Sequence, residues 1–179
     1  MKTEDLVLQL LKNIGEDLQR EDLLETPKRV TKMYDEIFAG YQQNPQKILK
    51  KFDANGYDAI IIVKNIEYFS TCEHHMIPFF GMANVAYLPN KHITGLSKIP
   101  RLIDCFAKRL QNQERLTMQI ANTLFQELKP RGVAVQITGK HLCMCGRGVK
   151  KTTSETVTNK FLGEFSQNPS LRADFLTQI

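Results

Sequence analysis

The chain has 179 residues, 42% of them hydrophobic, and a formal charge of +5 at neutral pH. This length fits one domain with a small helical appendage, and the apolar share is enough for a core without tryptophan. The longest aliphatic run, residues 59–63, is far shorter than the roughly 20 residues of a membrane span. Acids are interleaved with the basic residues, which indicates a solvated surface rather than a nucleic-acid-binding face.

The N-terminal residues are acidic at Glu4 and Asp5, where a signal peptide would be basic and then apolar. Four cysteines could form two disulfides: Cys72, Cys105, Cys143 and Cys145. In a chain without an export signal, however, close cysteine and histidine spacings more often indicate metal binding or catalysis. We therefore expect a soluble cytoplasmic protein with no membrane or nucleic-acid partner.

The first predicted elements are helices. Leu6, Leu10 and Ile14 recur at helical spacing and predict a short amphipathic helix. Thr26 followed by Pro27 is typical of an N-cap and a first helical position, which predicts a helix through Phe38. Residues 41–57 contain turn-forming pairs and are expected to be a connection.

After the connection, the hydrophobic period changes to that of strands. In chain order the pattern predicts two strands, two helices, two strands and a last helix, over residues 59–70, 79–88, 100–110, 116–128, 133–145, 148–158 and from 168 onward. This order predicts an α+β fold with antiparallel hairpins. We expect an N-terminal helical region over residues 1–57 and a catalytic domain over 58–179.

Two clusters of reactive side chains stand far apart in the sequence. The first is Cys72-Glu73-His74-His75, directly after a predicted strand, where a thiolate and an imidazole three residues apart can reach one ion in a turn. The second spans residues 141–147. If that stretch is a regular strand, His141, Cys143, Cys145 and Arg147 share the face of Val133, Val135 and Ile137.

Cys72, His75 and Cys143 together form a donor set that suits zinc and leaves a fourth position for water. A zinc ion there would lower the pKa of its water and supply a nucleophile. Two other interpretations stay open: a closed structural site with Cys145 as the fourth ligand, and thiols without metal. His74 and His141 favour catalysis, because an enzyme that moves protons at neutral pH uses imidazoles.

Two further segments are weaker signals. Residues 95–101 place Ser97, Lys98 and Arg101 at the start of a helix, where free N–H groups and the helix dipole favour anions. Gln113 and Glu114 could accept from and donate to the edge of a guanine. For residues 95–101, taken alone, a solvated helix start is the favoured interpretation. For Gln113 and Glu114, the spacing does not distinguish an exposed first turn from a guanine-binding pair.

These stretches together resemble the GTP cyclohydrolase I family, in the family's order and over nearly the whole chain. The matching motifs are Leu24-Glu25-Thr26-Pro27-Lys28-Arg29, Cys72-Glu73-His74-His75, Ala86-Tyr87-Leu88-Pro89, Gly95-Leu96-Ser97-Lys98, Gln113-Glu114-Arg115-Leu116-Thr117, His141-Leu142-Cys143 and Arg147-Gly148.

The resemblance implies a tunnelling fold, which is a four-stranded antiparallel sheet in the order ββααββ with two helices on one face. It also implies a toroidal homodecamer with active sites at subunit boundaries. The implied reaction converts GTP and water into formate and 7,8-dihydroneopterin triphosphate, the first step toward folate-type pterins.

Residue by residue, the resemblance implies Cys72, His75 and Cys143 as zinc ligands. It implies His74 as an acid that protonates the imidazole portion of the purine, and His141 as a further proton donor and acceptor. It implies guanine recognition by Gln113 and Glu114. The implied triphosphate contacts are Ser97, Lys98, Arg101, Arg147 and Arg29.

Cys145 departs from the family pattern, and on the predicted face it could compete for zinc or form a disulfide with Cys143 or Cys72. Two alternative functions remain. One is the nitrile-reducing enzyme of queuosine synthesis, which shares the fold and uses a cysteine nucleophile and NADPH. The other is a zinc-stabilised nucleotide-binding module without catalysis.

Overall fold

The computed structural model describes residues 1–179. The chain forms two compact units, Met1–Ala39 and Gly40–Ile179. The domain boundary between residues 57 and 58 stays a prediction.

The first unit is helical, as the sequence predicts. It contains α1 (Thr3–Asn13), a 3₁₀ turn at Glu21–Leu23 and α2 (Thr26–Ile37), and the two α-helices pack against each other. Thr26 is the first residue of α2 and Glu25 is its N-cap, so the predicted cap is wrong by one residue. In α1, Val7 is the buried position, whereas Leu6 and Leu10 are exposed.

The second unit contains the sheet. Its strands are β1 (Lys51–Asp53), β2 (Ile61–Cys72), β3 (Pro78–Leu88), β4 (His92–Thr94), β5 (Leu110–Gln111), β6 (Gly132–His141) and β7 (Thr156–Gly163). Its helices are α3 (Lys98–Ala107), α4 (Gln113–Leu128), α5 (Leu142–Cys145), α6 (Glu164–Gln167) and α7 (Pro169–Gln178). Short 3₁₀ turns occupy Ala39–Gln42 and Pro45–Lys47.

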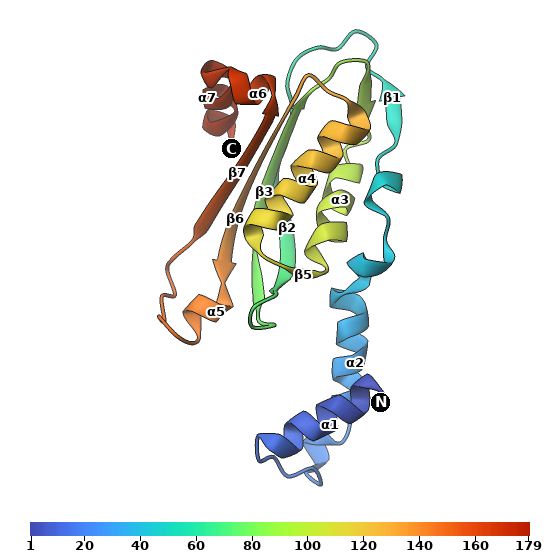
Figure 1. The fold of residues 1–179 in the computed structure, drawn as a ribbon, viewed down its shortest axis with the longest axis vertical. Coiled ribbons are helices and arrows are strands. Elements are labelled where there is room, and N and C mark those ends of the chain that lie inside the picture. Colours follow the sequence, from blue (N-terminus) through green and yellow to red (C-terminus); the bar gives the residue numbers. More distant parts are fainter. The chain divides into compact units, whose positions relative to one another are not determined.

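The main sheet has the strand order β5-β2-β3-β6-β7 (Figure 1). The four long strands pair antiparallel, and the two-residue β5 adds a parallel edge beside the end of β2. A separate ribbon pairs β1 with β4. The predicted α+β fold with the order ββααββ is confirmed, while β1, β4 and β5 lie in segments where the sequence predicted no strand.

Helices α3 and α4 lie side by side over one face of the sheet (Figure 1). The predicted stripe Leu116, Ile120 and Leu124 on α4 is fully buried against alternate residues of the strands. A smaller apolar cluster joins α6 and α7 to the sheet through Phe165 and Phe175. These two cores hold the ends of β2, β3 and β6 in a fixed register.

The chain ends in α7, as predicted from residues 168–169. The Asn168 side chain accepts hydrogen bonds from the N–H groups of Ser170 and Leu171.

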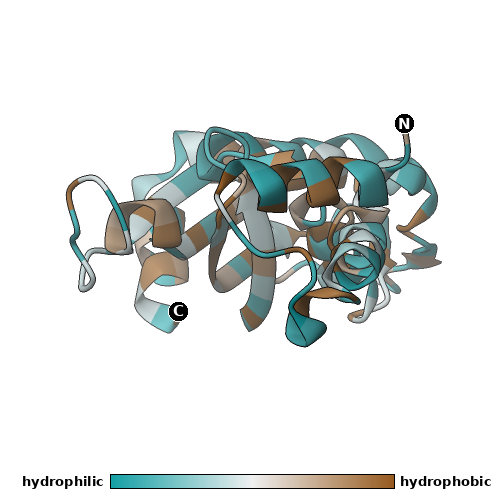
Figure 2. Cartoon of the chain, turned by 90° about the horizontal axis from the view of Figure 1, so that it is seen from below, coloured by the Kyte–Doolittle hydropathy of each residue, from teal (hydrophilic) through white to brown (hydrophobic).

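Figure 2 shows hydrophilic and hydrophobic residues interspersed along the chain. No helix has both the length and the apolar content that a membrane crossing needs.

Candidate functional site

The first reactive cluster lies in the turn between β2 and β3. Cys72 ends β2 and is 5% exposed, while His74 and His75 follow it on the exposed part of the turn. The turn is closed by hydrogen bonds from Cys72 N to Ile77 O (2.9 Å) and from Met76 N to Cys72 O (2.8 Å). The buried strand end therefore fixes the thiol, and the turn carries the imidazoles.

The second cluster lies at the same end of the sheet. His141 is the last residue of β6 and pairs in register with Phe79 of β3. The prediction of a strand through residue 145 is wrong, because the chain turns into the single-turn helix α5 at Leu142. Consequently Cys143, Cys145 and Arg147 do not continue the buried strand face.

Three side chains that could hold a metal ion lie close together between these clusters. The ligand atoms of Cys72, His75 and Cys143 all lie within 4.8 Å of one another. Burial, and after it the neighbouring Cys72 thiol, raise the pKa of the Cys143 thiol. Two thiols and an imidazole this close form a donor set for a soft or borderline divalent metal, which would stabilise the thiolate forms.

Cys145 lies outside this group of donors. Its Sγ faces Lys151 O at 3.5 Å, because residues two apart on a helical turn point in different directions. All four cysteines are free thiols.

Glu73 joins the ligand-bearing turn to the start of α4, a role that the sequence analysis missed. Its carboxylate accepts hydrogen bonds from Asn112 Nδ2 (2.8 Å) and from the Arg115 guanidinium. These donors lower the pKa of Glu73, with Arg115 the largest cause. Asn112 also caps α4 by accepting from Arg115 N at 2.8 Å.

The two predicted catalytic histidines have different surroundings. His74 is exposed, with its Nδ1 3.7 Å from Cys72 Sγ and its Nε2 3.7 Å from Glu73 Oε1. His141 is half-buried and stacks on Phe79, with ring centroids 4.6 Å apart and planes within 3°. Burial lowers the pKa of His141, and the charge of Glu114 opposes that shift.

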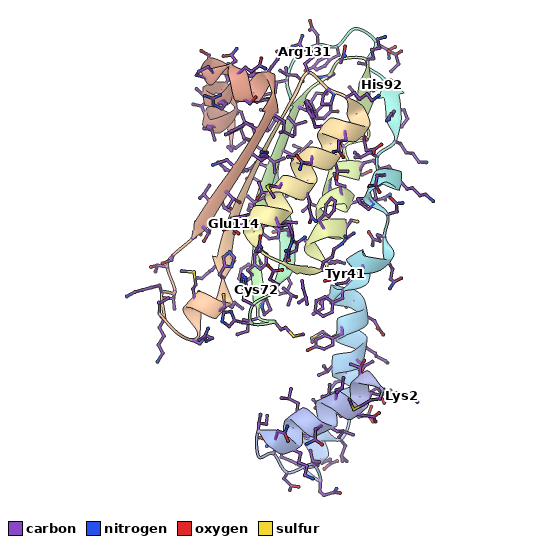
Figure 3. The ribbon with its side chains drawn as sticks, in the orientation of Figure 1. Lys2, Tyr41, Cys72, His92, Glu114 and Arg131 are labelled. Carbon is purple, nitrogen blue, oxygen red and sulfur yellow. The ribbon has the colours of Figure 1, made fainter.

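The predicted guanine-binding pair is divided between core and surface. Gln113 is 1% exposed, and its side chain hydrogen-bonds to His141 and to the β6 and β7 strands. Glu114, the next residue, is exposed. Figure 3 shows Glu114 and Cys72 toward the same end of the sheet, while His92 and Arg131 lie at the other end.

The predicted triphosphate-binding residues do not gather in one place. Arg147 lies beside the metal-ligating group, with its Nη1 2.7 Å from His75 Nε2. Ser97, Lys98 and Arg101 lie at the N-terminal end of α3, whose far end contacts β2 through the bond from Ser70 Oγ to Ala107 O. A helix of this length separates its ends by about 15 Å.

Arg29 belongs to the first unit. Its guanidinium donates to Asp22 O (2.8 Å) and to Thr26 Oγ1 (2.9 Å) within that unit. Its predicted contact with a triphosphate stays a prediction.

Comparison with known proteins adds independent information. A family model described as GTP cyclohydrolase I matches residues 3–179. The proteins named GTP cyclohydrolase 1 from Brucella canis, Brucella suis and Brucella melitensis are each 48% identical over 180 residues. Those alignments cover 99% of this chain and 84% of each relative. Among solved structures, the apo form of the archaeosine synthase QueF-like protein matches with a TM-score of 0.45 and 17% identity, covering 58% of this chain and 93% of that one.

Proposed function

This chain belongs to the GTP cyclohydrolase I family, and we propose that it hydrolyses GTP at a zinc centre held by Cys72, His75 and Cys143. The proposed products are formate and 7,8-dihydroneopterin triphosphate, which would feed pterin and folate synthesis. The observation that carries the proposed site is the convergence of three ligand atoms within 4.8 Å of one another.

The donor set fits zinc, which prefers mixed sulfur and nitrogen ligation. Because Cys145 faces Lys151 O instead, the group offers three protein donors and leaves a fourth position for water. When bound, the ion would supply Lewis-acid activation of a water molecule at neutral pH. The ligands would be anchored by separate parts of the chain, since Cys72 ends β2, His75 lies in the turn after it and Cys143 lies in α5.

The chain's own residues would then move protons. We propose that His74, which is exposed beside the ligands, donates a proton to nitrogen 7 of the purine. This proton neutralises the negative charge that would otherwise develop on nitrogen 7 when carbon 8 is attacked. His141, with its pKa lowered by burial, is mainly neutral at pH 7 and so is able to accept a proton. Ring opening and later ring closure need proton transfer both to the substrate and from it.

Recognition of the base is proposed for Glu114. Its exposed carboxylate can accept from the two donors, N1–H and the 2-amino group, on one edge of guanine. Adenine lacks this pair of donors, and would leave the carboxylate unpaired. The exposed first turn of α4 keeps that carboxylate at the end of the sheet where Cys72 lies (Figure 3).

Triphosphate binding is proposed for Ser97, Lys98, Arg101 and Arg147, with Arg29 as a further candidate. The length of α3 keeps its N-terminal residues away from Arg147 and the metal ligands of the same chain. We therefore propose that a second copy of this chain completes the site, in keeping with a toroidal homodecamer. The four free thiols support a reducing, cytoplasmic location.

The test is direct. Purified protein incubated with GTP should release one formate per GTP and yield a product that becomes fluorescent on mild oxidation. A chelator should abolish both signals, and added zinc should restore them. Binding of GTP without formate would indicate a binding module instead, and NADPH-dependent nitrile reduction would indicate the other enzyme class; either result would reject the proposal.

A further inference from the structure

The side chain of Gln113 is locked in one orientation by the sheet beneath it. Its Nε2 lies 3.0 Å from Ile137 O, 2.9 Å from Thr156 O and 3.1 Å from Thr158 Oγ1. Two of these partners are backbone carbonyls, which only accept hydrogen bonds. A flipped amide would place oxygen against oxygen, so the NH₂ group must face the carbonyl groups of Ile137 and Thr156. Oε1 then faces the other way, toward Gly139 and His141 at the end of β6.

The neighbouring hydroxyls form a chain of hydrogen bonds whose direction is fixed. Thr117 Oγ1 donates its single proton to Gln113 O at 2.7 Å. In the 2.7 Å contact between Thr117 and Thr158, Thr158 must therefore be the donor. Thr158 Oγ1 keeps its lone pairs for the Gln113 amide, and no member of the chain can reverse without breaking a bond.

Gln113 Oε1, the remaining atom, lies 2.9 Å from His141 Nε2. An amide oxygen has no proton to donate, so the bond exists only if His141 Nε2 carries one. In neutral imidazole the other nitrogen, Nδ1, then holds the free lone pair. The stacked ring of Phe79 holds the imidazole of His141 in its plane. The hydrogen bond to Gln113 determines that the proton is on Nε2.

We propose that Gln113 is a positioning residue that holds neutral His141 as the Nε2–H tautomer, which makes Nδ1 the atom that exchanges protons with the substrate. The inference rests on the proposed function of His141 and deepens it. It assigns Gln113 a different task from the predicted reading of guanine. Because both amide hydrogens are engaged by protein acceptors, base recognition at the start of α4 falls to Glu114.

The first test reads the tautomer in the parent protein. The chain has four histidines, so protein labelled with ¹⁵N only at histidine gives few ring signals, and a His141→Gln variant identifies those of His141. Solid-state ¹⁵N spectra near pH ~8.5, where an ordinary histidine with a pKa of about 6.5 is neutral, should show Nε2 protonated and Nδ1 unprotonated. A proton on Nδ1 would overturn the inference. This measurement needs no substitution at Gln113.

The second test separates positioning from base recognition. In Gln113→Leu, kcat should fall by about 10- to 100-fold, the range for residues that orient a functional imidazole, while KM for GTP stays nearly unchanged. The matched control is Gln119→Leu on the same helix, because the Gln119 amide contacts Gln111 and not His141. A raised KM and lost guanine selectivity in Gln113→Leu, with kcat unchanged, would refute the positioning role.

The two proposals can fail separately. A wrong tautomer in a protein that releases formate from GTP would reject the inference and leave the function standing. The Nε2–H tautomer in a protein that releases no formate would reject the function and leave the positioning geometry standing.

Discussion

Replacing Gly139 by alanine tests whether the space around the hydrogen bond between Gln113 and His141 can accommodate a methyl group. Gly139 lies in β6, and a methyl group there would overlap Gln113 Oε1 and lie 2.6 Å from the Tyr68 hydroxyl. Neither neighbour can move freely, because Gln113 is held by the two strands and Tyr68 donates to Thr138 O at 3.2 Å. The methyl group therefore has to displace buried, hydrogen-bonded atoms.

The expected cost combines two effects. Overpacking of a buried site costs about 1–3 kcal/mol, and each hydrogen bond that is broken as Gln113 moves adds about 1 kcal/mol. We expect Gly139→Ala to lower the free energy of unfolding by about 2–4 kcal/mol, measured by urea unfolding, and to disturb the ring nitrogen signals of His141. Gly146→Ala is the control, since its methyl group would meet only Leu142 O at 3.6 Å. If Gly139→Ala is as stable as this control and keeps the His141 signals, the packing argument is wrong.

Three other predictions concern the metal, the base and protons. Cys143→Ser should lose bound metal and formate release, whereas Cys145→Ser should keep both, since Cys145 faces Lys151 O; metal analysis of both variants checks this, and metal loss in Cys145→Ser would contradict the three-ligand site. Glu114→Ala should raise KM for GTP about 10- to 100-fold, the loss expected for hydrogen bonds to a charged group; retained preference for GTP over ATP would count against Glu114 as the reader of guanine. Because burial lowers the pKa of His141, its contribution to stability is present above the ordinary histidine pKa of about 6.5 and is lost as pH falls from there through the pKa of the folded protein. The free energy of unfolding, measured in urea from pH ~8 to ~5, should therefore fall more steeply in the parent protein than in His141→Gln. If the free energy falls equally in both proteins, His141 is not the cause.

The sequence predicts correctly the helices and strands that have a clear hydrophobic pattern. The stripe on α4 is buried against the main core, and β3 is buried on both faces along its second half, against the main core and the smaller cluster. Local sequence pattern and tertiary packing therefore agree in these elements. The prediction failed where no such pattern exists. The two- and three-residue strands β1, β4 and β5 depend on partners distant in the chain, as when Thr71 pairs with Leu110.

The stretch after His141 shows a different limit. Alternation of His141, Cys143 and Cys145 has the period of a strand, but β6 leaves the sheet at His141 and the chain coils into α5. Residue chemistry alone nevertheless predicts the group Cys72, His75 and Cys143. The single helical turn of α5, and not a strand, brings Cys143 close to Cys72. Donor chemistry was readable from the sequence, while the direction of each side chain was not.

The contact of Glu73 with Arg115 connects two parts of the candidate site. Glu73 lies between a proposed ligand and a proposed acid in the sequence, and its carboxylate is bonded to Asn112 and Arg115 at the start of α4. The turn that carries Cys72 is therefore tied to the helix that carries Gln113 and Glu114. The residues proposed for metal binding, proton transfer and base recognition are connected through the start of α4, where Asn112 caps the helix and Gln113 hydrogen-bonds to His141. Arg115 lies 42 positions from Glu73 in the sequence, so only the fold shows that the two side chains are in contact. The motif Cys72-Glu73-His74-His75 alone does not indicate this role of Glu73.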